Sequence, residues 1–223
     1  MSTTNGAREE MLRRIRSALQ DVPVDEQSEA VVVTRAYRHN APSEQQGMIE
    51  RFQERVSDYK VTVRRVQEQE LAAAIAAACT ARAVQRLVVP ADVPLSWLPT
   101  GLEILRDNDQ ALTNVNLDTS SGVLTGCALG IAQTGTIVLD GGAAQGRRIL
   151  TLLPDYHLCV IYEKQIVDLV PEAITRLSDA ARVDHRPITF ISGPSATSDI
   201  ELNRVEGVHG PRILDVLIVH AGE

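Results

Sequence analysis

The chain has 223 residues, of which 44% are hydrophobic and 23% charged, and its formal net charge is −7. This length and composition suit one globular domain with a sizeable core, or at most two small ones. The acidic balance and the aromatic content of only 3% argue against a surface that binds phosphate backbones or stacks bases, so nucleic acid is not expected as a partner.

The three cysteines, Cys79, Cys127 and Cys159, stand alone, without Cys-x-x-Cys spacing. We therefore expect no disulfide framework, no zinc or iron–sulfur site made by this chain, and no cofactor identified from its motifs. The N-terminus lacks the apolar segment of a secretory signal. The longest helical apolar run, Leu71 to Cys79, is about half of the ~20 residues that span a bilayer. The sequence thus predicts a cytoplasmic protein without a membrane span.

Residues 1–42 are predicted to form an N-terminal helix and a linker. Apolar residues from Met11 to Leu19 recur at helical spacing, and the arginines around them lie mostly off that stripe. We interpret these arginines as a solvated face, and a contact with a partner subunit is the alternative. The rest of this region is polar and shows no sustained period, apart from a short strand candidate at Val31–Val33.

Residues 43–223 alternate between helices and short apolar strands, which is typical of an α/β domain. Ser43 and Gln46 fit a capping box at the start of a helix. The further predicted elements are, in chain order, a strand at Val61–Val66, a helix from Leu71 to Cys79, strands at Leu87–Val89 and Leu158–Tyr162, a helix starting near Pro171, and strands at Ile188–Ser192 and Val216–Val219. This pattern predicts a mostly parallel sheet with flanking helices.

The first candidate ligand loop is a Gln-Thr-Gly-Thr segment in the second half of the chain. Ligands of open α/β sheets bind outside the carboxyl ends of the strands, where the chain enters loops. Gln133, Thr134, Gly135 and Thr136 offer an amide, two hydroxyls and a backbone that a ligand can approach closely.

An arginine pair follows this segment. Arg147 and Arg148 come directly after a glycine-rich loop at residues 140–146, which we expect to be flexible, and they suit a clamp for a carboxylate or phosphate. The alternative for the whole stretch is a β-hairpin followed by a solvated arginine pair.

The second candidate loop follows the strand at Ile188–Ser192. Gly193 turns the chain, and Ser198 with Glu201 matches a capping box at the start of a helix. Ser195 and Thr197 add hydroxyls that, together with the free N–H groups of a helix start, would hold an anion. The alternative is a capped helix without a ligand.

A third candidate is His209, which lies between Gly207 and Gly210 and is expected on a tight loop, where it would titrate near neutral pH. His157 is interpreted as a hydrogen-bonded structural residue. The sequence has no Walker loop, dinucleotide fingerprint or His-Glu-x-x-His motif. No motif therefore indicates that the chain binds a nicotinamide cofactor or ATP. No catalytic residue is assigned.

Four segments taken together resemble a known family. They are Ile-Ala-Gln-Thr-Gly-Thr-Ile-Val-Leu at 131–139, Leu-Pro-Asp-Tyr-His at 153–157, Ile-Ser-Gly-Pro-Ser-Ala-Thr-Ser-Asp-Ile-Glu at 191–201 and Gly-Val-His-Gly-Pro at 207–211. In order and spacing they are similar to the LUD domain of lactate-utilisation protein C, over roughly residues 45–220. The resemblance implies a NagB/RpiA/CoA-transferase-like fold and a role in oxidising L-lactate to pyruvate beside iron–sulfur partner proteins. Two positions depart from the family pattern. The family commonly has Glu where this chain has Gln133, and often has Lys or Arg where this chain has Ala196.

Three functional hypotheses follow. The first is a component of the L-lactate utilisation system that binds a small anionic metabolite. The second is an isomerase or CoA-transferase-like enzyme acting on a phosphorylated or CoA-linked small molecule. The third is a non-catalytic assembly subunit. The sequence does not decide whether the chain is an enzyme. The candidate ligand-binding residues are Gln133, Thr134, Gly135, Thr136, Arg147, Arg148, Gly193, Ser195, Thr197 and His209.

Overall fold

The computed structural model describes residues 4–21, 34, 36–39, 45–108, 112–198, 204–206 and 210–221. The chain divides into two compact units, residues 1–37 and residues 38–223, the second of which we call the body. The first unit contains α1 (Thr4–Ala18), so the predicted N-terminal helix is confirmed. The strand candidate at Val31–Val33 and the helix start at Ser43 lie outside the described residues.

A six-stranded sheet forms the centre of the body, and each of its neighbouring strand pairs is parallel. Its strands are, in spatial order, β1 (Thr62–Gln67), β12 (Ile213–His220), β7 (Tyr156–Tyr162), β4 (Gly122–Thr125), β2 (Arg86–Pro90) and β3 (Glu103–Asp107). This sheet confirms the mostly parallel arrangement that the alternating helices and strands predict.

A smaller sheet contains the glycine-rich part of the chain. Its strands are β8 (Ile166–Val167), β5 (Leu129–Ile131), β6 (Thr136–Leu139) and β9 (Thr189–Ile191), in that order. The strands β5 and β6 are antiparallel, and β9 is antiparallel to β6. The Gln-Thr-Gly-Thr segment is therefore the turn and first strand residue of a hairpin, which is the alternative weighed from the sequence.

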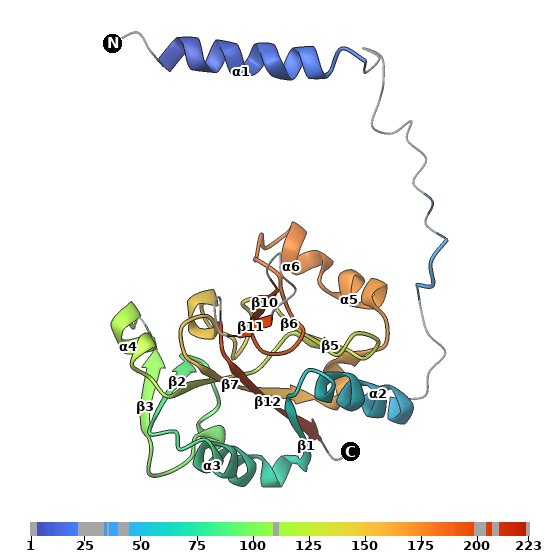
Figure 1. The fold of residues 1–223 in the computed structure, drawn as a ribbon. Coiled ribbons are helices and arrows are strands. Elements are labelled where there is room, and N and C mark those ends of the chain that lie inside the picture. Colours follow the sequence, from blue (N-terminus) through green and yellow to red (C-terminus); the bar gives the residue numbers. More distant parts are fainter. Residues whose placement is uncertain are drawn as a thin grey trace. The chain divides into compact units, whose positions relative to one another are not determined.

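Helices cover the outer sides of the two sheets. Figure 1 shows α3 on one side of the six-stranded sheet and the smaller sheet with α5 and α6 on the other. The helices of the body are α2 (Gln45–Ser57), α3 (Leu71–Ala81), α4 (Asn114–Asp118), α5 (Val170–Arg176) and α6 (Ser178–Arg182). Single 3-10 turns are η2 (Glu68–Glu70), η3 (Leu95–Trp97), η4 (Arg148–Thr151) and η5 (Glu163–Gln165). None of the described helices combines the length and apolar character needed to cross a bilayer.

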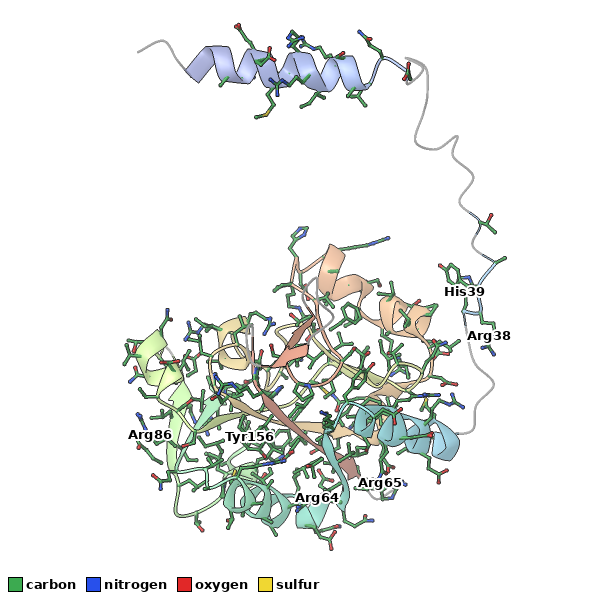
Figure 2. The ribbon with its side chains drawn as sticks, viewed as in Figure 1. Arg38, His39, Arg64, Arg65, Arg86 and Tyr156 are labelled. Atoms are coloured by element: carbon green, nitrogen blue, oxygen red, sulfur yellow. The ribbon has the colours of Figure 1, made fainter. Side chains whose placement is uncertain are left out.

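The central strands are apolar on both faces because both faces are covered. In β7, Leu158 and Val160 pack in one core cluster with residues of α3, and Cys159 and Ile161 pack in a second cluster with residues of α2 and the smaller sheet. Burying a side chain of this size stabilises the fold by about 2 kcal/mol. Figure 2 shows Tyr156, at the start of the same strand, inside the body, where its hydroxyl donates to Asp215 at 3.1 Å.

The helix predicted after Ser198 falls on residues outside the described ones. Ala196–Ser198 form β10, which pairs antiparallel with β11 (Arg204–Glu206). The sequence did not predict the strands β3 and β4, because β3 has three charged residues and β4 contains a glycine.

Candidate functional site

A cavity of about 240 Å³ is lined by residues of both sheets and of the turns next to their strands. His157 and Leu214, which line it, are the second residues of β7 and β12, so the cavity lies at the amino ends of these strands. The expectation of a site at the carboxyl ends is therefore not met by this cavity, because β9 and the turn after it reach the amino ends instead. The described lining residues are Arg148, Thr151, His157, Phe190, Ile191, Ser192, Gly193, Pro194, Ser195, Gly210, Pro211 and Leu214.

Arg148 gives the cavity its charge. No Asp or Glu occurs among the described lining residues, and no described carboxylate forms an ion pair with Arg148. The guanidinium Nη1 donates to the Thr151 hydroxyl at 2.8 Å and to the Thr151 carbonyl at 3.3 Å, which fixes its position within η4. Burial lowers the pKa of the guanidinium, because a charge without a countercharge loses hydration. A bound anion would supply that countercharge.

His157 lies beside Arg148 and is fully buried. Its Nε2 is 2.7 Å from the hydroxyl of Thr125 at the end of β4. Burial, and then the positive charge of Arg148, lower the pKa of His157 to about 4. The imidazole is therefore neutral near pH 7, and Arg148 is the only charged group among the described lining residues.

Three hydroxyls run from the hairpin turn to the cavity. The hydroxyls of Thr134 and Thr136 are 2.7 Å apart, and those of Thr136 and Ser192 are 2.8 Å apart. Thr136 is buried, and Ser192 lines the cavity. The antiparallel register, which pairs Ile137 with Ile191, brings β6 and β9 together and thereby joins the two candidate loops that lie apart in the sequence.

Two glycines of the candidate loops pack against the last turn of α2 and the residues that follow it. A Cβ on Gly135 would lie 2.6 Å from the carbonyl carbon of Arg55, and a Cβ on Gly193 would lie 2.6 Å from the Cβ of Tyr59. Both glycines have positive φ, of +59° and +87°. From the sequence, Gly135 is expected to let a ligand approach the backbone, but the group that comes close to it is the backbone of the helix.

The remaining predicted residues divide into three groups. Ser195 lines the cavity with Gly193. Arg147 does not line it, because its guanidinium donates to both oxygens of Asp107 at 2.8 and 2.7 Å. The side chain of Gln133 is exposed and is also absent from the lining. Thr197 belongs to β10 but its side chain is not among those described, and His209 lies outside the described residues.

Sequence reasoning missed three polar side chains that line the cavity, Thr151, His157 and Ser192, the last of which it took only as the end of a strand. Thr151 lies three residues after Arg148, a spacing that allows contact within one helical turn, and this signal was available. The place of His157 in the lining depends on the strand order, which no local pattern gives. Among the described residues, no three His, Cys, Asp or Glu side chains are grouped to hold a metal ion.

Comparisons with known proteins agree on one family. The model of the LUD domain matches residues 49–219, a range that includes Arg148, His157 and Ser192. Lactate utilization protein C of Deinococcus radiodurans is 47% identical over 179 residues, which cover 80% of this chain and 82% of that protein. Lactate utilization protein C of Halalkalibacterium halodurans is 42% identical over 84 residues, 36% of each chain. The crystal structure of a DUF162 family protein from Deinococcus radiodurans has a TM-score of 0.70 and 40% identity, and the match covers 80% of this chain and 99% of that one.

Proposed function

Because the chain belongs to the LUD-domain family, we propose that it acts in L-lactate utilisation and binds a small carboxylate at Arg148. The names of its relatives support the pathway. The cavity supports the ligand class, since it combines a guanidinium with hydroxyl groups and no described carboxylate.

One observation carries the ligand proposal, namely that the Arg148 guanidinium lines the cavity, loses part of its hydration there and has no countercharge among the described residues. A guanidinium in such surroundings gains charge-assisted hydrogen bonds when a carboxylate enters. The cavity volume of about 240 Å³ is below the roughly 300–1,000 Å³ of sites for drug-sized ligands. A metabolite of a few carbon atoms therefore suits it better than a nucleotide or a CoA thioester.

The neighbouring arginines provide the test. Thermal unfolding of the wild-type chain is measured with and without millimolar L-lactate or pyruvate, and the same is done for Arg148→Ala and Arg147→Ala. A ligand at about twenty times its Kd adds about 2 kcal/mol to the free energy of unfolding and raises the Tm by roughly 4–8 °C. The shift should vanish in Arg148→Ala and persist in Arg147→Ala, whose guanidinium binds Asp107. An unshifted wild-type Tm, or equal losses in both variants, contradicts the proposal.

The CoA-transferase-like alternative receives less support from the described residues. Gln133 has an exposed amide where the family commonly has a carboxylate, and its side chain does not line the cavity. An amide is a hydrogen-bonding group and cannot form an acyl anhydride with a CoA ester. We therefore favour binding of a carboxylate over acyl transfer at this position.

We also propose that the chain works with iron–sulfur partner proteins, as the family resemblance implies, and that α1 makes the contact. Large apolar side chains of α1 are exposed, among them Met11 at 64% and Ile15 at 47%. An exposed apolar stripe on a helix is a common docking element. The double variant Met11→Gln, Ile15→Gln should lose co-purification of such partners while keeping the carboxylate-induced Tm shift of the body. Retained co-purification contradicts the contact.

A further inference from the structure

The chain of three hydroxyls that ends in the cavity is fixed by strand pairing. The hydroxyl of Thr136 is buried and has a hydroxyl partner on each side, at 2.7 Å from Thr134 and at 2.8 Å from Ser192. The carbonyl of Thr134 accepts a hydrogen bond from Tyr59 at 3.2 Å, which holds the hairpin turn in place. Thr134 is half-exposed and Ser192 lines the cavity, so the two ends of the chain meet solvent and ligand respectively.

The protons of this chain have two possible orders that leave no buried proton unpaired. The buried Thr136 hydroxyl must donate its proton to one neighbour and therefore accepts from the other, so the proton that remains lies at one end of the chain. In the first order, Ser192 accepts from Thr136 and directs its own proton into the cavity. In the second order, Ser192 donates to Thr136 and presents only lone pairs to the cavity. Either atom of each pair can be the donor.

Exchanging the two orders costs no buried hydrogen bond. In both orders the hydroxyl of Thr136 donates once and accepts once, so no buried polar group is left unpaired. The exchange needs only rotation of the three O–H bonds, because the oxygen positions stay the same. Ser192 can therefore act as a donor or as an acceptor toward a ligand without any change in the fold.

On the basis of the proposed carboxylate site, we infer that Ser192 recognises the oxygen atom next to the carboxylate and that the cavity takes 2-hydroxy acids and 2-oxo acids alike. A 2-oxo group only accepts hydrogen bonds and requires the order in which Ser192 donates. A 2-hydroxy group has a proton of its own, and the other order provides an acceptor for it. The hydroxyl chain thus lets one cavity hold a hydroxy acid and its oxidised counterpart, with Arg148 on the carboxylate of both.

The experiment is isothermal titration calorimetry of the full chain with L-lactate, pyruvate and propionate, which lacks the oxygen on C2. In the wild-type chain, we expect L-lactate and pyruvate to bind within about threefold of each other and propionate to bind about tenfold more weakly, the loss of roughly one hydrogen bond. In Ser192→Ala, all three acids should bind with about the affinity that the wild-type chain has for propionate.

Thr134→Val tests the proton order itself. Valine leaves the buried Thr136 hydroxyl with Ser192 as its only hydroxyl partner. Because Thr136 would bury an unpaired proton if it accepted from Ser192, Thr136 donates to Ser192, and Ser192 donates into the cavity. Pyruvate should keep its affinity and L-lactate should weaken by about threefold or more. Thr175→Val, which removes an exposed hydroxyl of α5, should change neither affinity.

The outcomes separate this inference from the function on which it rests. If none of the acids binds, or if Arg148→Ala binds them as well as the wild type, the carboxylate site is wrong and the inference is lost with it. If all three acids bind equally through Arg148, the carboxylate site stands and the recognition of the C2 oxygen is overturned. An unchanged lactate-to-pyruvate ratio in Thr134→Val overturns the proton order alone. A thermal melt of each variant shows that it is folded.

Discussion

Arg147 and Arg148 are adjacent in the chain and differ in what surrounds their guanidinium groups. Arg147 donates to both carboxylate oxygens of Asp107 and to the Leu112 carbonyl at 3.1 Å, which ties η4 to the end of β3. The Arg148 guanidinium donates hydrogen bonds only to Thr151 of its own turn, among the described residues. The sequence shows two equivalent arginines, and the strand order decides which of them meets a carboxylate and which lines the cavity.

Arg147→Ala should destabilise the body, because the Asp107 side chain is only 4% exposed and loses its charged partner, keeping only the hydrogen bond from the Leu112 N–H. The hydrogen bonds from Arg147 lower the pKa of Asp107, so their contribution is present above the ordinary Asp pKa and is lost as pH falls below it through the lowered pKa of the folded chain. Since Arg147 is 45% exposed, we expect a loss of about 1–2 kcal/mol at pH 7. Urea unfolding of the wild type and of Arg147→Ala, at pH 7 and at a pH below the ordinary Asp value of 3.8, measures this difference in the free energy of unfolding. A loss that grows toward acid pH contradicts the assignment.

The buried His157 should make the body sensitive to acid. The unfolded chain binds a proton at the ordinary histidine pKa of 6.5 and the folded chain only near 4, so unfolding takes up a proton in between. The free energy of unfolding therefore has its highest value above pH 6.5, and it falls by about 3 kcal/mol as pH drops toward 4. Urea unfolding of His157→Gln should lack this part of the pH dependence.

The control for this prediction is the exposed His185. Its backbone φ is +53°, a conformation that asparagine tolerates, so asparagine is the replacement. His185→Asn should keep the wild-type slope between pH 6.5 and 4. Equal slopes in the wild type and in His157→Gln rule out His157 as the source of the acid sensitivity. His157 also marks the limit of sequence reasoning at this scale, because a histidine before a strand gives no sign of burial beside an arginine.

At the scale of elements, the end of α2 positions both candidate loops. The hairpin turn at Gly135 packs on Arg55 in the last turn of α2, and the turn at Gly193 packs on Tyr59, two residues after the helix ends. The same helix buries Phe52 against Gly130 of β5. The smaller sheet is thus held on the larger one by α2, and the hydroxyl chain depends on this contact.

Gly135→Ala should destabilise the body by about 3 kcal/mol, because the new Cβ would lie 2.6 Å from the backbone of Arg55 in addition to the cost of a positive φ. Gly101→Ala is the matched control. Gly101 has a φ of +83°, and a Cβ added to it would have nothing within 4 Å, so only the backbone cost of about 1 kcal/mol applies. Chemical unfolding of both variants gives the difference, and equal losses contradict close packing at Gly135.

Local patterns predicted the elements whose residues alternate or repeat clearly, such as α3 and β7. They failed where a long-range contact decides the outcome. The polar strand β3 exists because it pairs with the buried β2, and Ser198 is a strand residue because β11 lies beside it. The candidate loops were identified, but the pairing of β6 with β9 that brings Thr136 to Ser192 needs the three-dimensional topology.

At the scale of the whole molecule, the chain consists of two units that are compact separately, with the boundary after Tyr37. The match to the LUD domain starts at residue 49, within the second unit. A truncated chain that begins at residue 38 should therefore keep its Tm within about 2 °C, and it should keep the carboxylate-induced shift while losing any partner held by α1. Differential scanning calorimetry with and without L-lactate measures the first two points. A drop of more than about 5 °C would show that the body needs the first unit.

The single positive charge among the described lining residues of the cavity has a consequence for the conditions under which the protein works. If the proposed carboxylate site is right, one guanidinium beside a neutral imidazole does not separate one monovalent anion from another by charge, so chloride should compete with the metabolite for Arg148. Selection then rests on shape and on the hydroxyl of Ser192. The ionic composition of the surrounding solution consequently sets the lowest metabolite concentration to which such a site responds.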